Sequence, residues 1–312
     1  MALNIIERIV TSLIRGHINI KHISIIMDGN RRYAKEKGIH LSLGHYMGSK
    51  TLIQIIEICI RLNIKILSVF SLSLLNYNRS PEEIHFLFYL NILVLINENF
   101  FFNFVKENKI RIKIIGNLSY VNENYRKIIY NIEERTKGFD NLTLNIFFSY
   151  TSKNEMSLCE FNPNLYYDTC KELLQERNIN YSSSPIEKNQ NDNESSKKII
   201  INEKKKFKNN IQMKCYCGKY FYLDDPEKLK IINYHDKLLT SKLPPPNILI
   251  RTSGEHRLSD FMLYQISEFT EIYFINEYWP FFNFLQFIYV ILHYTIFQTT
   301  NFLFSYSNPC QH

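Results

Sequence analysis

The sequence predicts an α/β fold: a single domain whose central, mostly parallel six-stranded sheet is flanked by helices. Short runs rich in β-branched residues alternate with segments long enough for a helix, a pattern typical of βαβ units. The chain has 312 residues, of which 45% are hydrophobic, so it can bury a substantial core. The predicted strands are 22–27, 64–72, 110–115, 142–148, 247–251 and 271–275.

The helices predicted between these strands are 44–62, 81–107 and 120–136. A Ser-Pro-Glu-Glu run at 80–83 is a favourable helix start. The segment that follows it, 81–107, is apolar nearly all round. We therefore expect this helix to be buried on several sides or to line an apolar cavity.

Both ends of the chain carry apolar segments. Residues 1–20 place apolar side chains at helical spacing, which predicts an amphipathic helix. We expect it to pack on the body of the fold; the alternative is a helix resting on a membrane surface. Residues 281–300 are interrupted by polar groups, which are costly in lipid, so a packed or interface helix is favoured over a membrane span. Residues 301–312 are predicted to be a tail.

Composition narrows the class of protein. The net charge of +7 is modest and the lysines concentrate in one segment, which argues against nucleic-acid binding. The six cysteines lack the spacing of a zinc site, which indicates reduced thiols in a cytosol-facing protein. Residues 178–210 have few large apolar side chains, so they are predicted to be a disordered insertion in a domain spanning 21–300. The alternative for its lysines is a weak membrane or partner contact.

A polar cluster, D-G-N-R-R at 28–32, follows the first predicted strand. Asp28 alone would be interpreted as a helix N-cap. The glycine, the helix start and two arginines favour an anion site instead, because glycine lets the backbone approach a ligand and guanidinium groups bind phosphate oxygens. An acid in this setting is well placed to hold Mg²⁺ against a diphosphate.

Two further polar clusters follow predicted strands. Arg251, Arg257 and Ser259 surround a strand-to-helix turn, and we interpret them as a second anion site. The alternative is a solvated loop whose arginines pair with Glu255 and Asp260. The segment 73–79 is by itself only a polar turn. In a parallel sheet, however, all three clusters lie on one edge, and two diphosphate-sized sites beside an apolar channel predict an enzyme that acts on prenyl chains.

Several motifs resemble those of the cis-prenyltransferase family, in the right order along residues 20–160 and 245–295. They are D-G-N-R-R-Y-A-K at 28–35 with Gly44-His45 downstream, S-Y-T-S-K-N-E-M at 149–156, and R-T-S-G-E-H-R-L-S-D-F at 251–261 with Trp279-Pro280. The R-R-Y and Y-T-S sequences within these motifs look most like those of the eukaryotic dehydrodolichyl diphosphate synthases.

The resemblance implies a transferase with an apolar tunnel and a butterfly-shaped dimer. Its reaction is repeated 1′-4 condensation of isopentenyl diphosphate onto an allylic diphosphate such as farnesyl diphosphate. By similarity, Asp28 works with Mg²⁺, and Glu271 is a second acid linked to Mg²⁺ and to the subunit interface. The allylic diphosphate would be held by Gly29, Asn30, Arg31 and Arg32, and isopentenyl diphosphate by Arg251, Arg257 and Ser259. The polar network around the reacting groups would comprise His45, Ser73, Asn76 and Arg79, with Tyr77 as a further substrate-binding residue.

The chain departs from the family pattern at several positions. Leu75 and Leu41 stand where glutamate and arginine are usual, Lys153 replaces an arginine, and the Arg-rich C-terminal ending is absent. Such an ending often comes from an accessory subunit, so we expect a homodimer or a heterodimer. The expected role is synthesis of long-chain polyprenyl diphosphate for dolichol, with peripheral membrane contact, at the cytosolic face of the endoplasmic reticulum or in the cytosol. The alternative is a non-catalytic accessory subunit.

Overall fold

The computed structural model describes residues 3–78, 84, 87, 101–161, 212–214, 220–222 and 237–307. These fall in two compact units. The first combines residues 1–169 and 243–312, and it contains the whole six-stranded sheet. The second spans Cys170–Lys242, and in its described part Gln212–Lys214 (β5) pairs with Tyr220–Tyr222 (β6) in antiparallel fashion. The insertion predicted at 178–210 lies outside the described residues.

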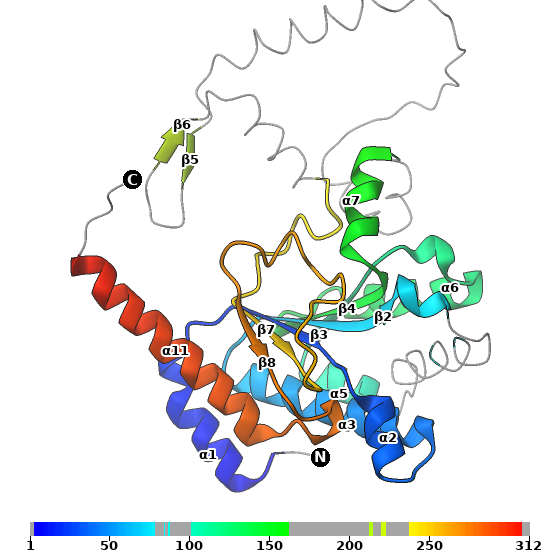
Figure 1. Cartoon of the computed structure of the whole chain (residues 1–312), viewed down its shortest axis with the longest axis horizontal. Helices are drawn as coiled ribbons and strands as arrows, with labels where there is room; N and C mark the ends of the chain where they lie inside the picture. Colours follow the sequence, from blue (N-terminus) through cyan, green and yellow to red (C-terminus); the bar gives the residue numbers. More distant parts are fainter. Residues whose placement is uncertain are drawn as a thin grey trace, which may run out of the picture. The chain divides into compact units, whose positions relative to one another are not determined.

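The six strands of the sheet are all parallel (Figure 1), in the order β3-β4-β2-β1-β7-β8. They are β1 (His22–Ile26), β2 (Ile66–Ser73), β3 (Ile110–Ile115), β4 (Leu142–Tyr150), β7 (Ile248–Arg251) and β8 (Glu271–Phe274). Every predicted strand is confirmed, with ends shifted by at most two residues. All of β1 and β7 is buried, as expected for central parallel strands covered on both faces.

The helices are α1 (Ile5–Ile14), α2 (Asn30–Glu36), α3 (Leu41–Arg61), α5 (Phe101–Glu107), α6 (Glu123–Thr136), α7 (Ser152–Phe161) and α11 (Phe284–Ser307). Short 3₁₀ turns are η1 (Arg15–His17), η2 (Leu74–Asn78), η3 (Leu118–Tyr120) and η5 (Trp279–Phe281). Two starts differ from prediction because polar side chains cap the helices: His40 accepts from the Ser42 N–H, and Asn122 from the Asn124 N–H. Most of the helix predicted at 81–107 lies outside the described residues. Helix α7 was not predicted.

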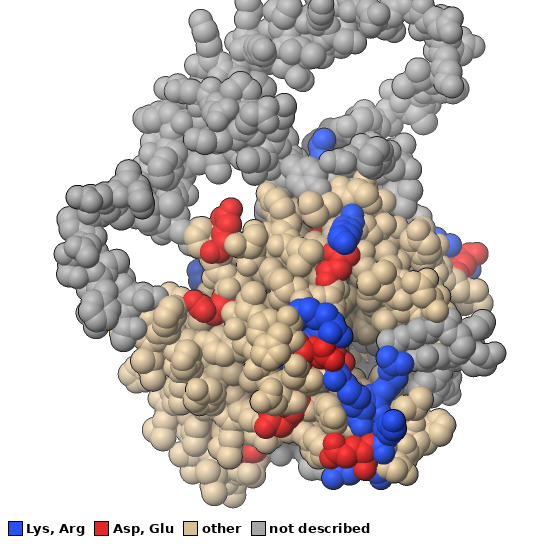
Figure 2. All heavy atoms as spheres, viewed as in Figure 1, with Lys and Arg blue, Asp and Glu red and all other residues tan. Residues whose placement is uncertain are grey.

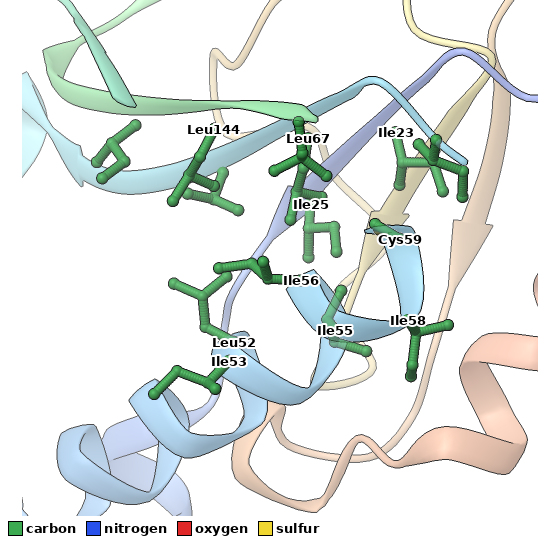
Figure 3. Close-up of a cluster of buried hydrophobic side chains, with 14 of the residues drawn as sticks. Ile23, Ile25, Leu52, Ile53, Ile55, Ile56, Ile58, Cys59, Leu67 and Leu144 are labelled. Carbon is green, nitrogen blue, oxygen red and sulfur yellow. The ribbon is translucent and has the colours of Figure 1, made fainter. Parts of the chain in front are cut away.

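The core lies between α3 and the sheet. Ile55, Ile56 and Cys59 of α3 are fully buried. Figure 3 shows this helix against the sheet, with its apolar side chains next to Ile25 and Leu67 of the strands. Helices α1, α2 and α11 in turn contact α3. This packing fixes α3 beside the strand that begins the site.

Helix α1 packs on the body of the fold, as predicted, but leaves much of its apolar face exposed. Val10 and Ile14 pack against the core, but Ile5, Ile6 and Leu13 are each more than 70% exposed. Packing on the fold therefore uses only one edge of its apolar face.

Helix α11 is a packed helix, as predicted, and it continues to Ser307, seven residues into the predicted tail. It buries Phe287 and Ile291 while leaving Leu285 and Tyr289 exposed. In the part of the chain that the structure describes, every helix is too short or too polar to cross a membrane.

Candidate active site

The carboxyl ends of β1, β2 and β7 meet at one edge of the sheet. Ile26 of β1 is level with both Phe70 and Arg251 on its two neighbours. The turns after these strands therefore lie together, and they open onto a cavity of about 1080 Å³. The predicted site residues that line it are Asp28, Gly29, Asn30, Arg31, Arg32, His45, Ser73, Asn76, Arg251, Arg257 and Ser259. We call residues 28–32 the first turn, 251–259 the second turn and 73–79 the third turn.

In the first turn, Asp28 does not cap a helix. Gly29 is the N-cap residue of α2, and no side chain caps that helix. One carboxylate oxygen of Asp28, Oδ2, instead accepts from Arg251 Nη2 at 2.9 Å and lies 3.3 Å from Arg32 Nη2. The other oxygen, Oδ1, makes no hydrogen bond within the described residues. The N-cap interpretation is wrong, and the acid is held at the cavity by two arginines.

The backbone of the first turn is fixed from two sides. Thr252 of the second turn donates its hydroxyl to the Asp28 carbonyl at 2.7 Å, and the backbone N–H of Trp279 donates to the same carbonyl at 2.9 Å. Gly29 has a left-handed φ of 107°, and a Cβ there would lie only 2.8 Å from Tyr278 Cβ. Only glycine satisfies both constraints at once.

Close packing on α3 sets the position of Asn30. A Cβ on Gly44 would lie 2.5 Å from the Asn30 carbonyl oxygen, and one on Gly48 only 2.3 Å from Asn30 Oδ1. Trp279 donates its indole N–H to the Gly48 carbonyl at 2.8 Å. Sequence reasoning missed Gly48; the available signal was its spacing of one helical turn from Gly44.

The second turn is built around Arg251, which is 2% exposed. Its Nη1 donates to Ser259 Oγ at 2.7 Å and also to the Arg257 carbonyl. Arg257 itself is exposed and pairs with Glu255. Glu255 also accepts from Arg32 at 3.0 Å, so this acid links the first and second turns.

Glu255 entered the sequence analysis only as a possible loop partner of the arginines. It pairs with Arg257 and with Arg32 of the first turn, and it also lines the cavity. Figure 2 shows basic and acidic side chains gathered together on this face of the molecule. The solvated-loop alternative is therefore correct only for the Arg257–Glu255 pair. Arg251 is buried and pairs with Asp28, and Asp260 accepts from backbone N–H groups of Ser152 and Lys153.

The third turn supplies fewer groups. Ser73 and Asn76 line the cavity, and the Asn76 side chain accepts from the Ser73 N–H at 3.0 Å. Leu75, which replaces the usual acid, also lines it. Tyr77 does not line the described part of the cavity; its hydroxyl lies 2.6 Å from Ser149 Oγ, and burial raises its pKa. Arg79 lies outside the described residues.

Apolar side chains line much of the remaining cavity, as expected for an apolar channel, with Lys35, Ser49 and Ser71 among them. The apolar residues come from α3, the sheet, α5, α6 and position 87, and they are Leu52, Val69, Leu87, Phe101, Ile114, Ile129, Ile146 and Phe148. The cavity therefore joins a charged region to an apolar region, which suits a ligand with an anionic head and an apolar tail.

The structure does not bring Glu271 to Asp28. Glu271 begins β8 and is level with Ile248, which is level with Ile23 near the start of β1. Asp28 follows the opposite end of that strand. The described residues include no group of three or more His, Cys, Asp or Glu arranged to hold a metal ion. Asp28 alone can still hold Mg²⁺ together with substrate, because Mg²⁺ often takes one or two carboxylates plus phosphate oxygens.

Comparisons with known proteins identify the family to which the chain belongs. The prenyltransferase family model described as undecaprenyl diphosphate synthase matches residues 26–301. A tritrans,polycis-undecaprenyl-diphosphate synthase of Thermoplasma acidophilum is 30% identical, over 94% of this chain and 93% of its own. The dehydrodolichyl diphosphate synthase complex subunit SRT1 of Saccharomyces cerevisiae is 32% identical, over 89% of this chain and 66% of its own.

A solved structure has the same fold. The crystal structure of lavandulyl diphosphate synthase from Lavandula x intermedia superposes with a TM-score of 0.62 at 23% identity, covering 88% of this chain and 95% of that chain. The chain belongs to the cis-prenyltransferase family of undecaprenyl diphosphate synthases.

Proposed function

We propose that this chain is a Mg²⁺-dependent cis-prenyltransferase that elongates an allylic diphosphate, such as farnesyl diphosphate, with isopentenyl diphosphate. The observation that carries the proposal is the position of Asp28. Its carboxylate lies between Arg32 and Arg251, at the point where two arginine-bearing turns meet a cavity with apolar walls. Two substrates that each carry an anionic diphosphate, one of them with a growing apolar chain, match this arrangement.

In the proposed reaction, the first turn holds the allylic diphosphate and the second turn holds isopentenyl diphosphate. The bond between allylic C1 and the diphosphate oxygen breaks, isopentenyl C4 forms a bond to C1, and a proton leaves isopentenyl C2. Negative charge grows on the departing diphosphate, and Arg31 and Arg32 line the cavity where they can stabilise it. Because these groups are already in place, little reorganisation is needed during the reaction.

Asp28 is the residue that would hold Mg²⁺, through the oxygen that the arginines do not use. When bound, the ion neutralises charge on the leaving diphosphate. The acids at the site have a second effect. Asp28 and Glu255 hold Arg32, Arg251 and Arg257 together, and substrate phosphates can take over these arginine contacts.

The rival function, a non-catalytic accessory subunit, does not require a charged site. Asp28 and all four arginines of the first and second turns are present and line one cavity. This favours catalysis. We propose that the product is a long-chain polyprenyl diphosphate for dolichol synthesis at the cytosolic face of the endoplasmic reticulum. The R-R-Y sequence at 31–33 and the Y-T-S sequence at 150–152 support this product.

We also propose that α1 binds the membrane surface. Its exposed apolar side chains, Ile5, Ile6, Ile9 and Leu13, are flanked by the exposed bases Arg8 and Arg15. Such a helix can insert its apolar face at an anionic lipid surface. We expect the double variant Ile6→Ser, Ile9→Ser to lose most co-sedimentation with phosphatidylserine vesicles; unchanged sedimentation would contradict this role.

We propose that the chain binds a second subunit, which is either another copy of itself or an accessory chain. The exposed apolar residues Leu285, Tyr289 and Ile296 on α11 support it, because a protein surface with several large apolar groups on one helix often serves as an interface. Sedimentation of the purified chain, alone and with a candidate accessory chain, tests this assignment.

The deciding experiment supplies the purified chain with farnesyl diphosphate, labelled isopentenyl diphosphate and Mg²⁺, and resolves products by length. We expect stepwise elongation that EDTA abolishes. Absence of elongation both alone and with a candidate accessory subunit would refute catalysis. Elongation that persists in EDTA would refute the metal requirement only.

A further inference from the structure

The second turn is held by an unusual backbone. After Arg251, which ends β7, its residues form no helix or strand. Non-glycine residues with left-handed φ occur at Ser253 and Ser259 in the turn and at Asp260 and Met262 just after it. Such conformations cost free energy and persist only where the surrounding structure enforces them. Ser259 is one of these residues and also the one that accepts from Arg251. Something outside the cavity must therefore hold this part of the chain.

The start of α7 provides the first set of contacts. The Ser152 N–H donates to the Asp260 carbonyl at 2.8 Å, and the Lys153 N–H donates to Asp260 Oδ1 at 3.1 Å. The Leu263 N–H donates in turn to Ser152 Oγ at 3.1 Å. Asp260 is adjacent to Ser259, so these bonds fix the backbone immediately beside the site.

Glu155, one helical turn into α7, provides the second set. It is 1% exposed, and its Oε2 accepts from the Tyr150 hydroxyl at 2.6 Å and from Gln265 Nε2 at 3.1 Å. Tyr150 ends β4, whereas Gln265 lies beyond the second turn. The acid therefore ties the segment after Ser259 to the sheet. Burial and the Glu155 charge both raise the pKa of Tyr150, so its hydroxyl stays a donor.

We propose that Glu155 is a positioning residue for the isopentenyl diphosphate site, a proposal that rests on the function proposed above. Glu155 is not among the described residues that line the cavity, so it acts through others. It fixes the segment 260–265, which places Ser259 against Arg251. The first turn is held by α3, Trp279 and Thr252 instead, so loss of Glu155 should affect one substrate far more than the other.

The test compares the two substrates in steady-state kinetics. In Glu155→Ala we expect the KM for isopentenyl diphosphate to rise tenfold or more, while the KM for farnesyl diphosphate changes less than twofold. Glu155→Gln keeps an acceptor oxygen and should show a smaller rise in the same KM. Tyr150→Phe removes one hydrogen bond with little change in volume, and should fall between wild type and Glu155→Ala.

The matched control is Glu134→Ala, because Glu134 is an exposed acid on α6 with a surface ion pair to Lys137. It should leave both KM values unchanged. If Glu155→Ala does not fold, Glu155→Gln and Tyr150→Phe carry the test. Equal changes in both KM values, or a fall in kcat alone, would overturn the positioning role.

The wild-type protein separates failure of the positioning role from failure of the proposed function. If the proposed function is wrong, wild type elongates no allylic diphosphate, either alone or with a partner. In that case calorimetry with isopentenyl diphosphate compares wild type and Glu155→Gln directly. Weaker binding in the variant would support the positioning role, and equal binding, or none to either protein, would reject it.

Discussion

The first and second turns carry arginines to the same cavity, but they are held in different ways. The first turn leads directly into α2, which packs tightly on α3 through Gly44 and Gly48. The second turn has no helix of its own. Its Ser253 and Gly254 N–H groups donate to the Glu277 and Ile275 carbonyls, and the segment directly after it, 260–263, is hydrogen-bonded to α7. Its main arginine, Arg251, is nearly inaccessible, whereas Arg31 of the first turn is exposed.

This difference shows that two arginine-bearing turns at one cavity can be held in position by different kinds of contact. Shape complementarity between two helices fixes the first turn, so a single added methyl group should disturb it. Polar cross-links fix the second turn, so loss of a single hydrogen-bonding group should disturb it. The two turns meet at the Asp28–Arg251 ion pair, where both modes of support are needed.

The largest effect is expected at that pair. Asp28→Ala should lower kcat/KM on the order of 1000-fold, because it removes the proposed Mg²⁺ ligand and the partner of Arg251. Elongation assays measure the loss. Since Ala leaves a buried guanidinium without its acid, the melting temperature should also fall.

Asp28→Asn separates the two effects. It preserves an oxygen that can accept from Arg251 while removing the charge, so it should retain more stability and still lose most activity. Near-normal turnover in both variants would remove Asp28 from the mechanism.

A second comparison separates buried from exposed arginines in the second turn. Arg251→Lys should lower kcat/KM about 100-fold, because an ammonium group cannot reproduce the guanidinium contacts with Asp28, Ser259 and the Arg257 carbonyl. Arg257→Lys is the matched control, and we expect at most a severalfold change because that side chain is 64% exposed. Kinetics that rank these two variants in the reverse order would contradict the burial argument.

The helix packing that supports the first turn gives a third prediction. Gly48→Ala should lower elongation activity about tenfold and destabilise the protein by about 1–3 kcal/mol, because the new methyl group meets Asn30 Oδ1. Urea unfolding and elongation assays measure both effects. Gly138→Ala serves as the control, since its Cβ meets nothing within 4 Å. Equal behaviour of the two variants would show that this packing does not position the site.

The smallest effect on activity is expected at His22, whose side chain connects β1 to β2 and to the segment before β7. Its Nδ1–H donates to the Pro244 carbonyl at 2.7 Å, and its Nε2 accepts from the Ser68 hydroxyl at 2.7 Å. Burial lowers its pKa from 6.5 to about 4. The unfolded chain therefore binds the proton more readily, and stability is lost as pH falls from 6.5 towards 4.

This titration should reduce the free energy of unfolding by about 2 kcal/mol between pH 7 and pH 5, measured by urea unfolding. The variant His22→Gln should show a pH dependence smaller by that amount, with turnover at pH 7 nearly unchanged. An identical pH dependence in wild type and variant would mean that His22 does not titrate in this range.

Much of the fold could be predicted from the sequence, because strand periodicity and βαβ alternation are local signals. The six strands followed from them. The first and second turns were proposed from the polar residues after the strands, and the other candidate site residues from the family resemblance. Helix α7 was missed because residues 152–161 have little amphipathic pattern. Gly48 and Glu255 were not assigned to the site. Gly48 matters because it packs against Asn30, and Glu255 because it pairs with Arg32, and both contacts form only when separate segments of the chain meet.

The sequence by itself determined the parallel sheet, the three polar turns that follow its strands and the motifs of a cis-prenyltransferase. Only the tertiary structure decided that Asp28 binds Arg251 instead of capping a helix, that Tyr77 contacts Ser149, and that Glu271 lies far from Asp28. The physical reason is that periodicity specifies which residues form an element, whereas the direction and partner of a polar side chain depend on elements that meet only after folding.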